Sequence, residues 1–254
     1  MFKLNNKKAI VTGGGSGIGK AVCLLFGKAG AHVFVADLNK QAAEETVTAI
    51  KAAGGNATAM SVNVADQQEV ITAYTAAGNI DILVNSAGVS HIGKVETTSA
   101  EDFDKVFNVN VKGVYNSLYA AIPLMKQNGG GVIVNLASIA SSVGIPDRFA
   151  YSMSKGAVLA MTLSTAKDYI KDHIRCNCIS PARVHTPFVD GFLAKNYPGR
   201  EAEMFEKLSQ TQPIGRMASP DEIAALILYL CSNEASFITG CDYPIDGGFI
   251  KLNN

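Results

Sequence analysis

Short apolar runs alternate with longer amphipathic segments along the chain. The apolar runs predict strands at residues 8–12, 31–36, 57–64, 80–85, 131–136 and 174–180. The amphipathic segments predict helices after residue 19, near residue 40 and at residues 66–77, 99–125, 150–170 and 220–231. Several runs are apolar at nearly every position, as strands covered on both faces must be. The pattern therefore predicts an α/β fold, a single-domain doubly wound parallel sheet of Rossmann-like type with helices on both faces.

Composition and charge exclude several classes of partner. The 254 residues fit one domain, 1–254, and 22 basic side chains balance 22 acidic ones, so no net field attracts nucleic acid or an anionic membrane. The first residues lack a signal-peptide core and no apolar run is long enough for a bilayer, which predicts a cytoplasmic protein without membrane contact. Five cysteines without paired metal-site spacing predict free thiols and no metal centre.

A glycine-rich turn follows the first predicted strand. The segment 13–19, GGGSGIG, leads directly into a helical pattern. Glycines let the backbone approach a pyrophosphate closely, and the N-terminus of a helix favours negative charge. The spacing of Gly13, Gly17 and Gly19 differs from the usual G-x-G-x-x-G dinucleotide fingerprint. The alternative is a glycine turn that binds no ligand.

Asp37 stands at the end of the second predicted strand, roughly twenty residues after the glycine turn. A carboxylate there can accept hydrogen bonds from the adenosine ribose and would repel the 2′-phosphate of NADP, which favours NAD. No arginine nearby offers a phosphate clamp, although Lys40 is close. The alternative is a helix N-cap, because Asp37 and Asn39 both precede the helix that starts near Lys40, and the two roles are compatible.

Polar and glycine residues gather at the carboxyl ends of the predicted strands, where doubly wound sheets bind their ligands. The cluster comprises residues 13–19, Asp37, Asn63, residues 85–88 (NSAG), Ser138 and Pro181.

Tyr151 and Lys155 are four residues apart in a predicted helix. That spacing places both side chains on one face, with their Cβ atoms about 5–6 Å apart. A nearby ammonium favours the phenolate, so we expect the pKa of Tyr151 to fall towards working pH, where a general base is most useful. Ser138 could then hold a substrate oxygen. The alternative is an exposed helix face that carries one tyrosine and one lysine.

Taken in order, these motifs resemble the short-chain dehydrogenase/reductase family. The likeness rests on TGGGSGIG at 12–19, NSAG at 85–88, Asn110 within NVNVKG, Ser138, and Tyr151-x-x-x-Lys155, and it spans essentially the whole chain. It implies an NAD-dependent oxidoreductase that interconverts a secondary alcohol and a ketone by hydride transfer. The segment RFAYSMSK is similar to the branch that acts on hydroxybutyrate, deoxy-sugar acids or L-fucose, which implies an acidic or polyhydroxylated substrate and a place in carbohydrate metabolism.

The resemblance implies a role for each matched residue. Tyr151 would be the acid/base, Lys155 would lower its pKa and hold the nicotinamide ribose, and Ser138 would orient the substrate oxygen. Asn110 would shape its helix and position a water in a proton relay through Lys155. The remaining cofactor contacts would be Gly13, Ser16, Gly17, Ile18 and Gly19 for the pyrophosphate, Asp37 for the adenosine ribose, Asn63 and Val64 for the adenine, and Asn85, Ala87, Gly88, Pro181, Val184 and Thr186 for the rest of the cleft.

Three positions depart from the family pattern. Asn63 stands where the family usually has aspartate, which keeps a carbonyl acceptor for the adenine but removes the charge. Ser86 replaces the commoner asparagine, with little expected effect. Pro181-Ala182 replaces Pro-Gly, so the loop after the sixth strand is less permissive than glycine would make it.

Four cationic or titratable side chains are expected near the substrate mouth together with Ser138: His91, Arg148, Arg183 and His185. An arginine one turn before Tyr151 could present a bidentate fork to a carboxylate, which favours a hydroxy acid. The alternative is that both arginines are surface or subunit-contact residues. Residues 187–215, including the long charged connection 188–212, are predicted to form a helical lid over the pocket.

The resemblance also implies a homotetramer. The predicted last strand near residues 243–249 would join one contact, and the helices 99–125 and 150–170 would form the other. Two other functions stay open: a 3-oxoacyl-[acyl-carrier-protein] reductase, which would normally use NADPH and against which Asp37 argues, and a dinucleotide-binding regulator without catalysis. The four occupied catalytic positions argue against the regulator.

Overall fold

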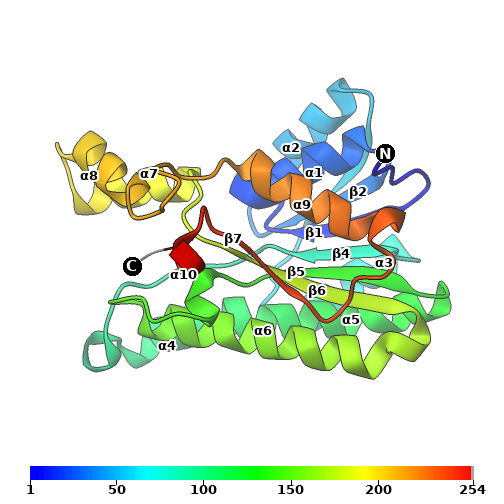
Figure 1. Ribbon diagram of the computed structural model, residues 1–254. Helices are drawn as coiled ribbons and strands as arrows, with labels where there is room; N and C mark the ends of the chain where they lie inside the picture. The colour runs from blue at the N-terminus through cyan, green and yellow to red at the C-terminus, as the bar shows by residue number, and fades with distance from the viewer. Residues whose placement is uncertain (253–254) are drawn as a thin grey trace.

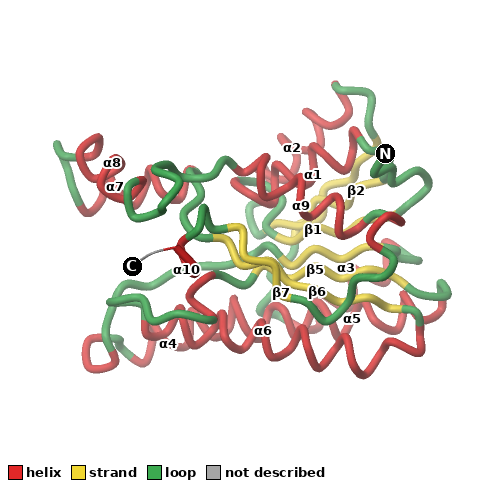
Figure 2. Tube along the Cα trace, viewed as in Figure 1, coloured by secondary structure: helices red, strands yellow, loops and turns green. Residues whose placement is uncertain are grey.

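A seven-stranded parallel sheet lies at the centre of the computed structural model, which describes residues 1–252 (Figures 1 and 2). The strand order is β3-β2-β1-β4-β5-β6-β7, so the direction of winding reverses between β1 and β4. The strands are β1 (Lys8–Thr12), β2 (His32–Asp37), β3 (Asn56–Ser61), β4 (Ile82–Asn85), β5 (Gly131–Leu136), β6 (Ile174–Pro181) and β7 (Asp242–Ile245). The predicted doubly wound parallel sheet is confirmed.

Helices cover both faces of this sheet (Figure 1). One face carries α1 (Gly17–Lys28), α2 (Lys40–Ala52) and α9 (Pro220–Cys231), and the other carries α3 (Gln67–Ala77), α5 (Gly113–Gln127) and α6 (Phe149–Tyr169). Further helices are α4 (Ala100–Val106), α7 (Pro187–Asn196), α8 (Glu201–Ser209) and α10 (Phe249–Leu252).

Alternate residues of each strand enter two separate cores. On β1, Val11 packs in the core under α1 and α9, whereas its neighbour Ile10 packs in the core over α5 and α6. Both side chains are fully buried. This two-sided burial explains why the strands are apolar at almost every position rather than at alternate ones.

Two differences from the predicted elements bear on the site. The predicted helix 99–125 consists of α4, a π-helical segment Phe107–Lys112 and α5, so one wide turn lies inside it and contains Asn110. Wide turns of this kind are frequent at functional sites. The predicted strand 57–64 ends at Ser61, so Asn63 and Val64 lie in the loop that follows.

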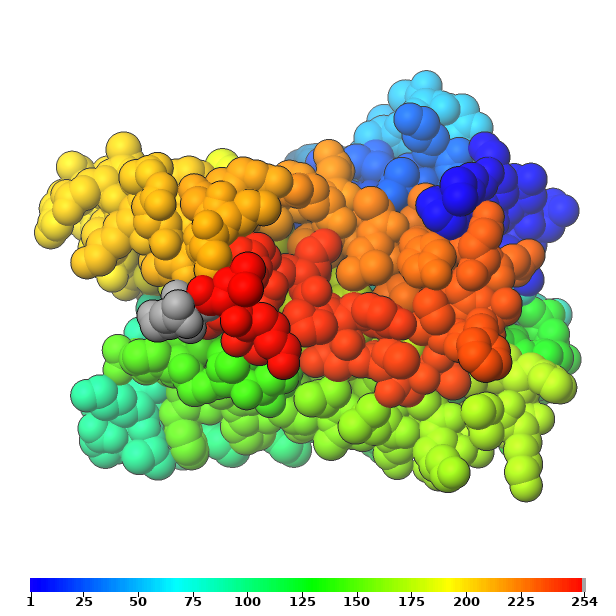
Figure 3. Space-filling view, viewed as in Figure 1, coloured from blue at the N-terminus to red at the C-terminus, as the bar shows by residue number. Residues whose placement is uncertain are grey.

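Helices α7 and α8 lie beyond the carboxyl ends of the strands, and they form a projection at one end of the molecule (Figures 1 and 3). The segment after α8 packs against the C-terminal residues, since the Ile214 amide donates to the Gly247 carbonyl. The predicted lid segment is therefore helical, and it stands beside the edge of the sheet where the candidate residues gather.

The described residues contain free cysteines, no membrane-spanning helix and no cluster of metal-ligating side chains. All five cysteines are free thiols, four of them buried, and burial raises the pKa of Cys178 to about 12. Within residues 1–252, no helix has the length and apolar character needed to cross a membrane. Over the same residues, no cluster of three or more His, Cys, Asp or Glu side chains has the arrangement of a metal site.

Candidate active site

Two glycines of the turn between β1 and α1, Gly13 and Gly19, have no room for a side chain. Gly13 has a φ of +67°, and a Cβ built there would lie 2.9 Å from the Cα of Ala87. A Cβ at Gly19 would collide with the carbonyl oxygen of Gly13. The turn is therefore packed closely against the segment after β4 and against itself, and these two positions require glycine.

The first turn of α1 is open to an anion. Ser16 occupies the N-cap position, but its side chain makes no capping hydrogen bond, and the first turn contains no acidic residue. Thr186 approaches the same turn, because a Cβ at Gly17 would lie 3.4 Å from its Cγ2. Uncapped N–H groups and the positive end of the helix dipole suit a phosphate. A tight glycine turn that leads into an uncapped helix N-terminus fits the pyrophosphate of a dinucleotide.

Asp37 lies on this turn rather than on the helix that follows it. Its Oδ2 accepts a hydrogen bond from the Gly15 amide at 2.9 Å, and its Oδ1 accepts one from the Asn39 amide at 2.9 Å. The N-cap of α2 is Asn39, whose side chain accepts from the Ala42 amide. The capping role considered for Asp37 thus belongs to Asn39, and the Asp37 carboxylate stands beside the phosphate-binding turn, where it fits a ribose hydroxyl.

The loop after β3 is held by its own polar side chains. The Asn63 side-chain oxygen accepts from the Ala65 amide at 3.1 Å, and the Glu69 carboxylate accepts from the Asn63 amide at 3.0 Å. The Val64 carbonyl accepts from the Asn116 side chain at 2.8 Å. The Asn63 oxygen therefore has one lone pair engaged within the loop and one left for a ligand.

The NSAG segment after β4 is fastened to β1 and to the core. The amides of Ser86 and Ala87 donate to the Thr12 hydroxyl at 3.0 and 3.1 Å. The Asn85 side chain is buried and donates to the Asn135 side chain at 2.8 Å. Asn85 therefore holds the sheet together, and it is the backbone of Ala87 that faces the glycine turn.

Asn110 ties the next part of this loop to the π-helical turn. It is 1% exposed, its Oδ1 accepts from the Val89 amide at 2.8 Å, and its Nδ2 donates to the Val89 carbonyl at 2.8 Å and to Ser154 Oγ at 3.0 Å. Its amide group thus joins the loop after β4 to α6.

Lys155 reaches from α6 to the end of β5. Its Nζ donates to the Leu136 carbonyl at 2.7 Å and lies 5.7 Å from the centre of the Tyr151 ring. The side chain is buried, and burial lowers the pKa of Lys155 from 10.5 to about 8. Part of the lysine population is therefore neutral slightly above neutral pH.

Tyr151 shows that one sequence prediction was wrong. The structure raises the pKa of Tyr151 instead of lowering it, because burial penalises the phenolate more than a hydrogen bond with Ser138 and the charge of Arg148 favour it. The Ser138 oxygen accepts from the Ala140 amide at 3.2 Å, which leaves its proton to donate. At neutral pH Tyr151 is therefore a protonated phenol beside a second hydroxyl, an arrangement that can donate a proton to a carbonyl oxygen.

Arg148 lies close enough to Tyr151 and to Arg183 for its charge to act on both side chains. Burial lowers the pKa of Arg148, and Tyr151, the Asp147 carboxylate and Tyr197 act on it in the opposite direction. Burial also lowers the pKa of Arg183, and the Arg148 charge lowers it further. Arg148 donates to the Asp147 carbonyl at 3.1 Å and Arg183 to the Thr211 hydroxyl at 2.9 Å. Within residues 1–252 neither guanidinium forms an ion pair with a carboxylate.

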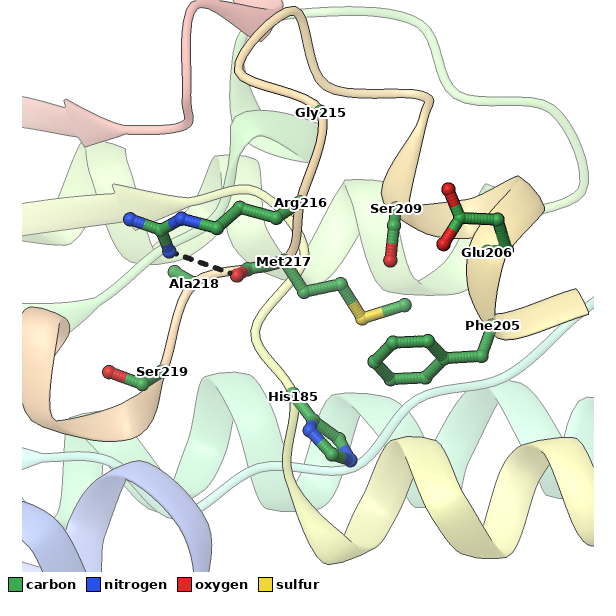
Figure 4. A pocket seen from close by; sticks show the side chains of 9 residues that line it. All are labelled: His185, Phe205, Glu206, Ser209, Gly215, Arg216, Met217, Ala218 and Ser219. Carbon is green, nitrogen blue, oxygen red and sulfur yellow. Dashed lines mark hydrogen bonds between the residues drawn. The ribbon is translucent and has the colours of Figure 1, made fainter. Parts of the chain in front are cut away.

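The two histidines have other neighbours. His91 Nδ1 lies 3.7 Å from Asp102 of α4. His185 Nε2 lies 2.8 Å from Asp190, and its ring meets the Phe205 ring edge-on at 4.8 Å. Figure 4 shows His185 and Phe205 in a cavity of about 260 Å³ between α8 and the loop before α9. The structure does not bring either imidazole into a hydrogen bond with Tyr151, Ser138 or Lys155.

Sequence reasoning missed several residues that build the site. Thr12 holds the NSAG turn, Thr211 holds Arg183, and Ser154 links Asn110 to α6. Ser154 stands three residues after Tyr151, so helical spacing alone places it near the Tyr151 carbonyl. The contact with Asn110 joins residues 44 positions apart, and no local pattern reports it.

Comparisons with known proteins agree with this geometry. A family model described as enoyl-(acyl carrier protein) reductase matches residues 13–250. The chain is 42% identical to an uncharacterized oxidoreductase of Thermotoga maritima over 97% of this chain and 98% of that protein. It is 35% identical to a 2-keto-3-deoxy-L-fuconate dehydrogenase of Xanthomonas campestris pv. campestris, over 97% of this chain and 81% of that protein. Its fold superposes with a TM-score of 0.94 on L-sorbose reductase of Gluconobacter frateurii complexed with NADPH and L-sorbose, at 29% identity and 98% coverage of both chains.

The buried charge of Lys155 predicts a pH-dependent cost in stability. Because the pKa of Lys155 falls from 10.5 unfolded to about 8 folded, the unfolded chain binds more protons between these values, and stability rises with pH through that window. We expect Lys155→Met to remove a penalty of about 3 kcal/mol at neutral pH, offset by about 1–2 kcal/mol for the unpaired Leu136 carbonyl. Urea unfolding should therefore find the variant more stable at pH 7, by a margin that shrinks at pH 9. A variant less stable than the parent at pH 7 would contradict the assignment.

Proposed function

The chain belongs to the short-chain dehydrogenase/reductase family, and we propose that it is an NAD-dependent oxidoreductase that interconverts a secondary alcohol and a ketone on a hydroxy acid, sugar acid or sugar. Membership establishes the coarser statement, an oxidoreductase that acts on CH–OH groups. The finer proposal rests on one observation. The Tyr151 phenol lies beside Ser138 and Lys155 at the carboxyl edge of the sheet, next to a turn suited to a dinucleotide.

The cofactor would be held by the glycine turn, the first turn of α1, Asp37, the NSAG backbone and Thr186. When bound, NAD supplies the hydride acceptor for oxidation and, reduced, the hydride donor for the ketone. Ser138 orients the substrate oxygen by donating its free proton. Tyr151 gives its phenolic proton to that oxygen during reduction and takes it back during oxidation. Lys155, fixed on the Leu136 carbonyl, places a positive charge near the phenolate that oxidation requires.

Tyr151 offers the first test of this chemistry. We expect Tyr151→Phe to lower kcat at least a hundredfold, because general acid/base catalysis contributes about 10²–10⁴ in rate. NADH binding, followed by fluorescence titration, should stay within twofold of the parent, since the ring still packs in place. The assay substrate is chosen by screening hydroxy acids, aldonates and free sugars for NADH production. Undiminished turnover would remove Tyr151 from the mechanism.

Asp37 supports the choice of NAD over NADP. Its carboxylate is fixed by the Gly15 amide of the glycine turn and by the Asn39 amide before α2, so a 2′-phosphate on the adenosine ribose would meet a negative charge. We expect the parent to have a higher kcat/KM with NAD than with NADP. In Asp37→Ala, the ratio of kcat/KM with NAD to kcat/KM with NADP should fall at least tenfold. Steady-state kinetics with both cofactors measure the ratio. A parent that prefers NADP would refute the proposal.

Arg148 and Arg183 support an acidic substrate. Among residues 1–252 neither half-buried guanidinium forms an ion pair, although the Asp147 carboxylate acts on Arg148 from a longer distance, and the Arg148 charge disfavours the charged form of Arg183. Most of their N–H donors are free, so a bound carboxylate would both satisfy these donors and reduce the repulsion. An acyl-carrier-protein thioester has no free carboxylate, and the pair therefore favours a hydroxy acid or sugar acid over that alternative.

Arg148→Leu tests the carboxylate. We expect the variant to raise KM at least tenfold for a hydroxy acid and less than threefold for a neutral sugar, because only the acid loses a charge-assisted hydrogen bond. Lys126→Leu, which removes a cation from the pair with Asp172 outside the proposed site and lid, is the control. Equal changes in KM for acid and sugar would exclude the carboxylate contact.

We also propose that residues 187–215 act as the substrate lid and that the chain assembles as a homotetramer. The lid proposal is supported by the position of α7 and α8 beyond the strand ends (Figure 1). The tetramer is supported by apolar side chains exposed on α5 and α6, among them Tyr115, Tyr119 and Leu163, which are 47%, 53% and 47% exposed. Sedimentation velocity of the purified chain measures the assembly.

A further inference from the structure

Ser154 is a fully buried hydroxyl between the two residues of the Tyr151–Lys155 pair. Its Oγ donates to the Tyr151 carbonyl at 2.7 Å and accepts from Asn110 Nδ2 at 3.0 Å. A hydroxyl has one proton, and a carbonyl can only accept, so the direction of both bonds is determined. Ser154 therefore links the first turn of α6 to Asn110 by two hydrogen bonds, and the donor and the acceptor of each bond are fixed.

Both the oxygen and the nitrogen of the Asn110 side-chain amide form hydrogen bonds. Its two N–H donors go to the Val89 carbonyl and to Ser154, and its oxygen accepts from the Val89 amide. No other orientation of the amide satisfies these three contacts. If the amide were flipped, its NH₂ group would face the Val89 N–H, and two donors cannot form a hydrogen bond. The chain of bonds thus connects three segments: the loop after β4, the π-helical turn and α6.

Lys155 fastens the same helical turn from another direction. While Ser154 binds Asn110, Lys155 Nζ binds the Leu136 carbonyl at the end of β5. Two successive residues of α6 are thus attached to two different elements at the carboxyl edge of the sheet. Such a pair of contacts resists both rotation and sliding of the helix, the two movements that would displace the Tyr151 side chain.

We propose that Ser154 is a positioning residue, which holds the Tyr151 phenol in register with the loop at 85–89 that lines the cofactor cleft. The inference rests on the proposed function, because it gives Ser154 a role only if Tyr151 transfers the proton. Displacements of about 1 Å at a reacting group can cost a large part of the rate. Loss of the Ser154 hydroxyl would also leave one Asn110 donor unpaired in the interior.

A matched control lies two residues away. The Ser152 hydroxyl is also buried, on the same turn of α6, but it has no hydrogen-bond partner among the described residues. Ser152→Ala removes the same atom from the same helix without breaking a bond. Comparison of the two alanine variants therefore separates loss of the link from loss of a buried hydroxyl.

The experiment compares Ser154→Ala, Ser152→Ala and Ser154→Thr with the parent, using the best substrate of the NADH-production screen. We expect Ser154→Ala to lower kcat roughly three- to tenfold, the rate equivalent of one lost buried hydrogen bond. NADH affinity and the KM for NAD should stay within twofold. The deuterium isotope effect on kcat, measured with substrate deuterated at the carbinol carbon, should rise as the chemical step slows. Ser154→Thr retains a hydroxyl that reaches the helix carbonyl and should recover most of the rate.

Several outcomes would overturn the inference. The first is a kcat for Ser154→Ala within twofold of the parent. The second is an equal loss of kcat in Ser152→Ala. The third is a loss of kcat in Ser154→Ala that is matched by proportional losses of NADH affinity and of thermal stability. If Ser154→Ala does not fold, Ser154→Cys keeps the shape of the side chain with only a weak donor, and its kcat is compared with that of Ser152→Ala in the same way. Tyr151→Phe is assayed alongside: if it retains turnover the proposed function fails, and if it loses turnover while Ser154→Ala does not, only the role of Ser154 fails.

Discussion

The parallel pairing of β1 with both β2 and β4 is the constraint on which the site depends. Thr12 at the end of β1 stands in register with Ala36 on one side and Asn85 on the other, so three strands finish at one level. The chain leaves these strands in opposite directions, which opens a crevice between the connections. The glycine turn and the NSAG turn meet across it, held together by the Thr12 hydroxyl and by the contact of Gly13 with Ala87.

The same edge of the sheet positions Tyr151, Lys155 and Ser138, the residues proposed to transfer the proton, and their burial there affects the charge of the first two. Strand β5 ends at Leu136, whose carbonyl binds Lys155, and Ser138 follows directly. Burial then acts on both titratable groups, raising the pKa of Tyr151 and lowering that of Lys155, so it favours the neutral form of each. A lysine and two hydroxyls buried in this cleft lower the stability of the fold. The protein tolerates this loss because hydrogen bonds with Asn110, Ser154 and the Leu136 carbonyl satisfy the polar groups around them.

Features that depend on local sequence were predictable, and features that depend on burial were not. Apolar runs, the glycine turn and the spacing of Tyr151 and Lys155 are local patterns, and they predicted the sheet and the residues at its edge. The pKa of Tyr151 was predicted in the wrong direction, because the spacing reports a nearby lysine but not the removal of water around the phenol. His185 was expected at the substrate mouth from its place after β6, whereas its partners Asp190 and Phe205 come from α7 and α8, whose packing no local pattern describes.

In the proposed function, structurally different parts of this chain carry out the proton transfer and select the substrate. Asn110, Ser154 and Lys155 are buried and bonded to main-chain groups of the sheet edge, so a substitution there disturbs the core. Arg148 and Arg183 instead come from connections, and Thr211 after α8 holds the second of them. Connections tolerate substitution far better than buried networks do. A chain built in this way can change the group that binds the far end of the substrate while the proton-transfer site stays unchanged, which is how one fold serves many alcohols.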